Sequence, residues 1–186
     1  MTTTLAPQTA MSAVGLRQVM RSFATGVCLA TTFTDESDRR VHDAITVNSL
    51  TSVSLAPPLI SVCLRNDSMF LADLIACQVW GVSILDLGGD DLAVRFSRDR
   101  EERAEALAGA GLVPGPRTGA LVKSGHSWME CELFRLVEAG DHTVVIGEVL
   151  NAESAIGRPP LLFLHGRFRA PRAPWGLGEQ SGVGCP

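Results

Sequence analysis

Short apolar runs, rich in β-branched residues, recur along this chain and are separated by turn-forming residues. Alternation with a period of two residues, or a short continuous apolar run, is typical of a β-strand. The pattern predicts strands over residues 27–33, 41–47, 59–64, 79–85, 120–140, 142–153 and 157–170. Gly140-Asp141 predicts a hairpin turn between two of these strands.

Helical spacing of apolar residues interrupts the strand pattern in three places. The first segment begins at Ser12, a favourable N-cap, and is expected to end at Gly26, a favourable C′ residue. Its apolar stripe, expected to close one side of the core, consists of Leu16, Val19, Met20 and Phe23. A short helix is predicted over residues 68–77, and one or two helices over residues 88–111.

The order of these elements predicts a mainly β fold with inserted helices. The strands are linked mostly by turns rather than by crossover helices, which favours a small closed antiparallel barrel over a doubly wound sheet. The sequence contains neither a P-loop nor a Gly-x-Gly-x-x-Gly motif after a strand, so a nucleotide is not expected to be bound in the Rossmann manner. We expect a flexible arm over residues 1–11, one domain over 12–170 and a flexible tail over 171–186.

Composition narrows the class of protein. The 186 residues carry a net charge of −4, and the charges are scattered without a basic stripe, so a nucleic-acid partner is not expected. No apolar run reaches the ~20 residues that cross a bilayer, and the N-terminus lacks the features of a signal peptide, so no membrane partner is expected. Five widely spaced cysteines without a Cys-x-x-Cys motif indicate reduced thiols in a cytoplasmic protein.

The sequence offers no convincing active site built from protein groups alone. It has no Gly-x-Ser-x-Gly elbow, and Glu130 and Glu132 are expected to form a solvated strand face rather than a catalytic pair. In each of the doublets His42-Asp43 and Asp141-His142, the two neighbouring side chains would point to opposite faces of a strand. No metal site is therefore predicted. Chemistry supplied by a cofactor needs few ionisable residues and is therefore the better hypothesis.

The stretch 42–59 carries small hydroxyl side chains and one amide where a core strand would carry Val or Ile. Such residues let a backbone approach a flat ligand with polar edges, as the isoalloxazine of a flavin has. Arg65, Asn66 and Ser68 follow the next predicted strand, at the start of a helix whose N-terminus favours anions such as a phosphate. A half-exposed sheet with no ligand explains the same hydroxyl-rich pattern.

Four motifs, in order and at compatible spacing, resemble the short-chain flavin reductases. They are FATGVCLATT (23–32), HDAITVNSLTSVSLAPPLISVCL (42–64), GDHTVVIGEV (140–149) and PLLFLHGRFRA (160–170). The resemblance implies an FMN-binding split barrel, six-stranded, antiparallel and of Greek-key type. It also implies a homodimer that uses NADH, or alternatively NADPH, to reduce FAD, or alternatively FMN, for a separate flavin-dependent oxygenase.

The resemblance also assigns site residues, with no catalytic side chain and no metal ligand. Flavin binding is expected of Thr46, Val47, Asn48, Ser49, Cys63, Leu64, Arg65, Asn66, Ser68 and Phe96. Contact with the nicotinamide nucleotide is expected of His142, His126, Arg167 and Phe168. His165 is expected to be a packed or interface residue on the last strand.

Two departures from the family pattern affect the expected site. Relatives commonly have Gly where this chain has Asp43, and Ala where it has Val47. Asp43 would be a charge beside an anionic ligand, so its side chain is expected to point away or to accept from a backbone N–H. Two other functions stay open, namely an oxidase of the same barrel with bound flavin and a non-catalytic flavin- or haem-binding module.

Overall fold

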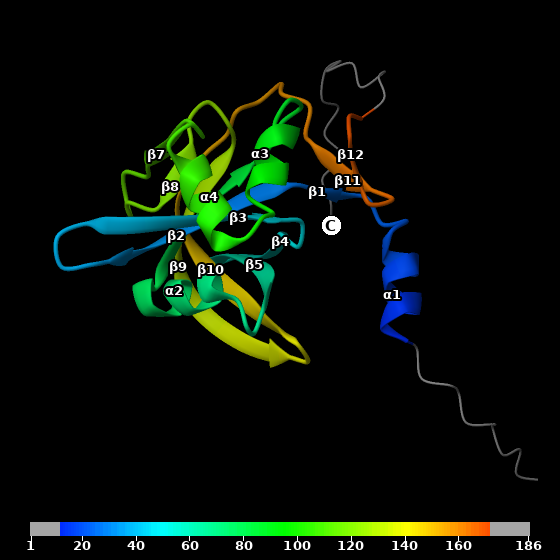
Figure 1. Cartoon of the computed structure of the whole chain (residues 1–186), viewed down its shortest axis with the longest axis horizontal. Helices are drawn as coiled ribbons and strands as arrows, with labels where there is room; N and C mark the ends of the chain where they lie inside the picture. The colour runs from blue at the N-terminus through cyan, green and yellow to red at the C-terminus, as the bar shows by residue number, and fades with distance from the viewer. Residues whose placement is uncertain (1–11, 172–186) are drawn as a thin grey trace, which may run out of the picture.

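A seven-stranded antiparallel sheet forms the centre of the protein (Figure 1). The computed structural model describes residues 12–171, so the predicted arm and all but the first residue of the predicted tail lie outside the described residues. In spatial order the strands are β3 (Arg40–Val47), β2 (Cys28–Asp35), β6 (Val79–Ile84), β9 (Trp128–Ala139), β10 (His142–Glu153), β5 (Pro58–Arg65) and β4 (Thr51–Leu55).

The prediction of a mainly β, antiparallel fold with inserted helices is confirmed. The predicted strand 142–153 coincides with β10, and the strands 41–47, 59–64 and 79–85 each agree with the structure within one residue at either end. The hairpin predicted at Gly140-Asp141 joins β9 to β10, where Ala139 pairs with His142 and Gly140 has a φ of 66°. A positive φ is inexpensive for glycine, which has no Cβ.

The sheet curls because its two edge strands are joined by only three residues. Six steps of ~4.8 Å would separate β3 from β4 by about 29 Å in a flat sheet, whereas the segment 48–50 can span at most about 14 Å. The edges must therefore approach each other at this corner. Within residues 12–171 the hydrogen-bonded ladder nevertheless ends at β3 and β4, so the sheet has seven strands and an open seam where a closed barrel was predicted.

Two small sheets complete the strand inventory. One consists of β1 (Thr25–Gly26), β11 (Leu162–Leu164) and β12 (Arg167–Arg169), and the other of β7 (Leu112–Pro114) and β8 (Leu121–Lys123). The single strand predicted over 157–170 is thus wrong. His165 (φ 53°) and Gly166 (φ 75°) form a two-residue hairpin turn, and His165 is exposed rather than packed.

Three helices lie between the strands. Helix α2 (Met69–Cys77) buries Phe70, Leu71 and Leu74 against a core cluster that contains Trp80. The segment 88–111 forms two helices, α3 (Asp90–Arg95) and α4 (Arg100–Leu107), which pack on a second cluster around Leu29 and Leu85. The Asp99 side chain caps α4 by accepting from the Glu102 N–H at 3.0 Å.

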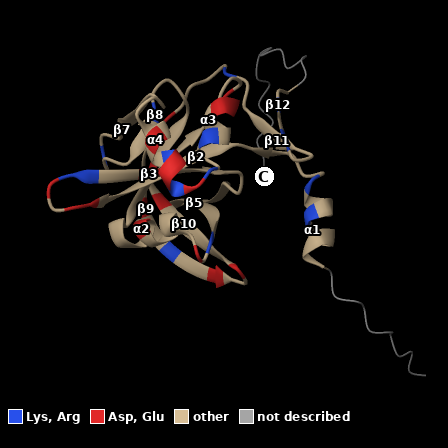
Figure 2. Ribbon diagram, in the orientation of Figure 1, with Lys and Arg blue, Asp and Glu red and all other residues tan. Residues whose placement is uncertain are grey.

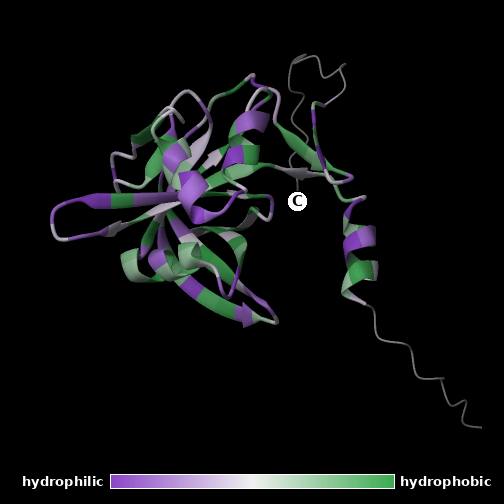
Figure 3. Ribbon diagram, viewed as in Figure 1, coloured by the Kyte–Doolittle hydropathy of each residue, from purple (hydrophilic) through white to green (hydrophobic). Residues whose placement is uncertain are grey.

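Helix α1 (Ala13–Met20) stands away from the sheet (Figures 1 and 3). Its predicted N-cap is confirmed, since the Ser12 hydroxyl accepts from the Gly15 N–H at 3.0 Å. The prediction that it closes the core of its own chain is wrong, because α1 has no buried residue and the Phe23 side chain after it is 62% exposed. The helix also ends at Met20, well before Gly26, which lies in β1.

Candidate functional site

A cavity of about 230 Å³ opens at the corner between β3 and β4. The ends of β5 and β10 and the start of α2 form its other walls. Eight of the ten predicted flavin residues line it, together with His142: Thr46, Val47, Asn48, Ser49, Cys63, Leu64, Arg65 and Ser68. The hydroxyl-rich corner and the predicted anion-binding turn are therefore walls of one cavity.

Strand pairing brings His142 to this cavity from a distant part of the chain. The antiparallel register of β10 with β5 places His142 opposite Arg65, and Val144 opposite Cys63. The side chain of His142 is 42% exposed. A histidine in the first position of one strand thus lies beside an arginine in the last position of its neighbour.

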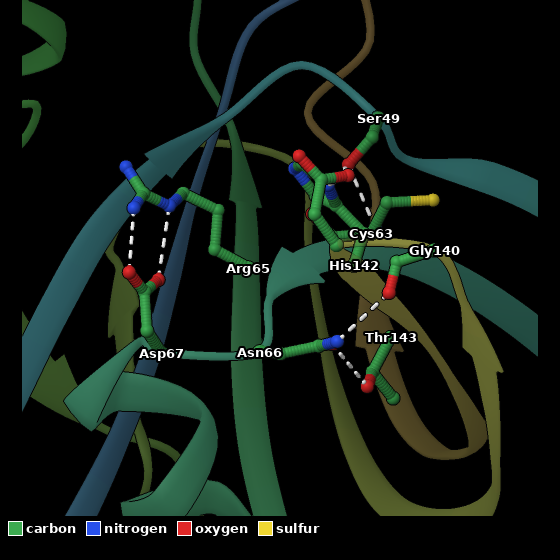
Figure 4. Close-up of polar contacts among 9 residues, drawn as sticks. Ser49, Cys63, Arg65, Asn66, Asp67, Gly140, His142 and Thr143 are labelled. Atoms are coloured by element: carbon green, nitrogen blue, oxygen red, sulfur yellow. Dashed lines mark hydrogen bonds and ion pairs between the residues drawn. The ribbon is translucent and has the colours of Figure 1, made fainter.

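Two of the predicted ligand hydroxyls are used by the protein itself. The Ser49 hydroxyl oxygen accepts from the Cys63 N–H at 2.9 Å and ties the corner to β5 (Figure 4). The Thr46 hydroxyl donates to the Ala93 carbonyl at 2.8 Å and ties β3 to α3. Asn48, in contrast, is exposed and forms no side-chain hydrogen bond within residues 12–171, which leaves its amide available to a ligand.

Asn66 supports the site rather than lining the cavity. Its side-chain amide donates to the Gly140 carbonyl at 3.1 Å, and its amide oxygen accepts from the Thr143 hydroxyl at 2.9 Å (Figure 4). Its backbone N–H also donates to the Asp141 carbonyl at 3.1 Å. These bonds hold the β9–β10 hairpin against the turn after β5, and so position His142 relative to Arg65.

Two ion pairs flank the cavity. Arg65 donates to Asp67 through Nε at 3.0 Å and Nη2 at 2.6 Å, and His142 Nδ1 lies 2.8 Å from Asp141 Oδ1. Hydrogen bonding to Arg65 lowers the pKa of Asp67, and hydrogen bonding to His142 lowers the pKa of Asp141. An ionised carboxylate only accepts, so Nδ1 of His142 carries the proton and Nε2 is left for another partner.

A second cavity of about 390 Å³ borders the same corner. It shares Asn48 and Ser49 with the first, and its further walls include Phe23, Thr25 and Leu50. The residue-level predictions omitted these three positions. The signal for Phe23 and Thr25 was nevertheless present, because the motif 23–32 that contains them carries part of the family resemblance.

Besides Asn66, four predicted residues line neither cavity. Phe96 is 1% exposed and belongs to the core cluster beneath α3 and α4. His126 is buried, with Nε2 3.0 Å from Asp86 Oδ1. Arg167 is exposed on β12, and the Phe168 ring packs on Phe163 with centroids 5.6 Å apart. Roles for these four in flavin or nucleotide binding stay predictions.

The carboxylate of Asp43 is directed away from the cavity, as its charge predicts. It accepts from the Ala44 N–H at 2.7 Å and from Arg103 of α4 at 2.8 and 3.0 Å. Both side chains of this ion pair are nearly buried. Asp43 therefore fastens α4 to β3 and places no charge in the cavity, whereas Val47 lines it.

Charges of both signs are interspersed over the ribbon (Figure 2). In the part of the chain that the structure describes, no three His, Cys, Asp or Glu side chains converge on a position for a metal ion. Across the same residues, no helix combines the length and apolar character needed to cross a membrane.

Comparison with known proteins adds to this geometry. The sequence profile described as "Flavin reductase like domain" matches residues 20–172. An NADH-dependent FAD reductase of Streptomyces globisporus is 36% identical over 158 residues, which cover 84% of this chain and 84% of that protein.

Two solved structures are similar to the chain over most of its length. One is the Streptomyces globisporus C-1027 NADH:FAD oxidoreductase SgcE6 in complex with NAD and FAD fragments, with 35% identity, 88% of this chain and 94% of that chain covered, and a TM-score of 0.78. The other is BorF, the flavin reductase component of a bacterial two-component tryptophan halogenase, with 36% identity, 86% and 98% covered, and a TM-score of 0.77.

Proposed function

Since the chain belongs to the flavin reductase like domain family, we propose that it is an NADH-dependent flavin reductase whose reduced flavin serves a separate oxygenase component. The observation that carries the proposal is the cavity in which the β3–β4 corner, Arg65 and His142 meet. The relatives described as an NADH-dependent FAD reductase and as a halogenase component supply the identity of the cofactors and the kind of partner.

The residues around the cavity fit a flavin. Arg65 and Ser68 would bind the phosphate, with the first backbone N–H groups of α2. Ser68 is the N-cap of α2 and makes no side-chain capping bond, so its hydroxyl is available. The exposed amide of Asn48 and the backbone of residues 46–49 would meet the polar edge of the ring. A bound flavin would supply the acceptor for the hydride of the reduced nicotinamide.

His142 would contact the nicotinamide nucleotide through Nε2, because Nδ1 is held by Asp141. No side chain of the site needs to accept a proton during hydride transfer, so we expect positioning of the two rings to supply most of the acceleration. The chain's contribution would then be to fix the corner through Ser49 and the hairpin through Asn66.

The test is NADH oxidation by the purified protein, with FAD, with FMN and without added flavin. We expect NADH consumption that rises with added FAD and falls to background without flavin. Flavin binding without NADH turnover would contradict the proposal and favour the oxidase or the non-catalytic binding module. A comparison of NADH with NADPH in the same assay determines the preferred donor.

We further infer that residues 12–170 form a split-barrel domain. The curl imposed by the segment 48–50 brings the two sheet edges together, and the seam between β3 and β4 would be the split. The six-stranded count of the family would then follow if β4 is regarded as the continuation of β3 around the corner.

A homodimer is also proposed, from the apolar surface that one chain leaves exposed. Leu16, Val19 and Phe23 are 55%, 63% and 62% exposed, and Leu55 at the end of β4 is 89% exposed. Exposed apolar surface of this extent is typical of protein interfaces. Phe23 also lines the second cavity, so a partner subunit packed on α1 would border the flavin site.

Replacing Val19 with glutamate is expected to weaken the dimer at least about tenfold, because a charge would be buried in an apolar interface. Sedimentation velocity at several concentrations measures the change. Gln18→Glu is the matched control, since it adds the same charge to α1 at an exposed polar position off the stripe of Leu16, Val19 and Phe23. A dimer unaffected by Val19→Glu would place the interface elsewhere.

A further inference from the structure

The cation at the proposed phosphate site is already paired with a carboxylate of the same turn. Asp67 accepts two hydrogen bonds from Arg65, from Nε at 3.0 Å and Nη2 at 2.6 Å (Figure 4). Arg65 lines the cavity, and Ser68 directly after Asp67 lines it too. A negative charge is therefore paired with Arg65 within the same short segment, residues 65–68, that is expected to bind a phosphate.

The edge of the guanidinium that Asp67 occupies is an edge that a phosphate would use. Nε and Nη2 form a fork that fits two oxygens of a carboxylate or of a phosphate. Both groups cannot use the same fork, and a phosphate on the remaining N–H groups would still lie close to the Asp67 carboxylate. In either arrangement Asp67 opposes the binding of an anion.

The Arg65–Asp67 pair is exchangeable rather than fixed. Each side chain is 69% exposed, and exposed ion pairs are weak because water screens them and both side chains lose rotamer freedom. A structural or orienting pair in this protein looks different: the Asp43–Arg103 pair is nearly buried and adds a bond to a backbone N–H.

We infer that Asp67 sets the affinity of the site for the flavin phosphate by competing with it for Arg65, and thereby keeps the flavin an exchangeable substrate instead of a permanently bound group. The inference rests on the proposed function. Asp141 lies at the same mouth but is engaged by His142 rather than by Arg65, so the competing group is Asp67.

The experiment compares the binding of FMN with that of riboflavin, which has the same ring and no phosphate. Asp67→Asn removes the charge, and we expect it to lower the Kd for FMN by about fivefold and to leave the Kd for riboflavin unchanged. Asp67→Glu keeps the charge and should retain the FMN affinity of the unmodified protein. Flavin fluorescence or calorimetry measures all of these constants.

Glu36→Gln is the matched control, since Glu36 pairs with the exposed Arg39 in the β2–β3 turn, outside the cavity. It should change neither Kd. In an Arg65→Ala background, Asp67→Asn should lose most of its effect, because the group under competition is gone.

Three outcomes would overturn the inference. Weaker FMN binding by Asp67→Asn would mean that Asp67 orients Arg65 for the phosphate. Equal tightening of FMN and riboflavin would mean that the substitution acts on the ring, and an unchanged FMN Kd would mean that Asp67 does not compete. The failure of the proposed function is distinct, because the unmodified protein would then not oxidise NADH with added flavin, whatever the FMN and riboflavin constants of the Asp67 variants.

Discussion

Replacing Glu130 with alanine is expected to lower the free energy of unfolding by about 4 kcal/mol, because its removal leaves a buried hydrogen-bonded network without its acceptor. Glu130 lies on β9 and is completely buried. Its carboxylate accepts from the Arg117 N–H at 3.0 Å, from the N–H and hydroxyl of Thr118 at 2.7 and 2.8 Å, and from Asn151 at 3.0 Å. Gly115 packs so closely on it that a Cβ would collide.

The same carboxylate gives a pH dependence with a definite sign. Burial alone would raise the pKa of Glu130, but the hydrogen bonds from Asn151, Thr118 and Arg117 outweigh it, and the pKa lies below its ordinary value. The stabilisation is therefore present above the unfolded-state pKa of about 4.3 and is lost as the pH falls through the folded-state pKa. Glu130→Gln should make the loss of stability in acid shallower.

Urea unfolding at neutral pH and at several acidic pH values measures both effects. Glu132→Gln is the matched control, because Glu132 lies two residues further along β9 and is exposed. It should change the free energy of unfolding by less than about 0.5 kcal/mol. An equally small change for Glu130→Ala would contradict the assignment of Glu130 as an anchor of the 115–118 loop.

The second large effect is expected at His142. Replacement by alanine should raise the KM for NADH by about tenfold, the equivalent of one hydrogen bond, and leave flavin binding nearly unchanged. The reason is its position: His142 lines the cavity, and its Nδ1 is already held by Asp141, which aims Nε2 at a second ligand. Steady-state kinetics with NADH varied at saturating flavin, together with a flavin titration, separates the two quantities.

His165→Ala is the control for this experiment, since His165 lies in the exposed turn between β11 and β12, outside both cavities. Asp141→Asn should also raise the KM for NADH, but by less than His142→Ala, because it weakens only the orientation of the imidazole ring. Equal losses of NADH and flavin binding by His142→Ala would mean that His142 supports the strand pairing rather than the nucleotide.

The strands were predictable from the sequence because each needs only local alternation. The apolar runs at 41–47 and 142–153 predict the two strands from their own residues, and Gly140 predicts the turn before the second of them. The hydroxyl-rich corner and the turn with Arg65 and Ser68 were predictable from their residue types, whereas the roles of Val47, Cys63, Leu64 and His142 came from the family resemblance. Alternation alone could not have placed His142 beside Arg65, because the register of β10 with β5 joins positions far apart in the chain.

The errors arose where burial depends on distant segments. Glu130 and Glu132 were predicted to share a solvated face, but the loop around Arg117 and Thr118 covers Glu130 and not Glu132. The stripe on α1 was assigned to the core of its own chain, although helical spacing only shows that a face is apolar and not which surface covers it. The hairpin at His165-Gly166 was missed because apolar residues recur beyond the turn, at Phe168, and His-Gly is not among the usual two-residue hairpin sequences.

Because the connection between β3 and β4 is short, residues near both edges of the sheet line the first cavity. Val47 lies on β3, at one edge of the sheet, and Cys63 lies on β5, which pairs with β4 at the other edge. A ligand that contacts both residues therefore connects the two edges across the open seam. The free energy of its binding opposes any separation of these edges. A flavin bound there would therefore stabilise the sheet against opening at this seam, and a substitution that loosens the seam would weaken flavin binding.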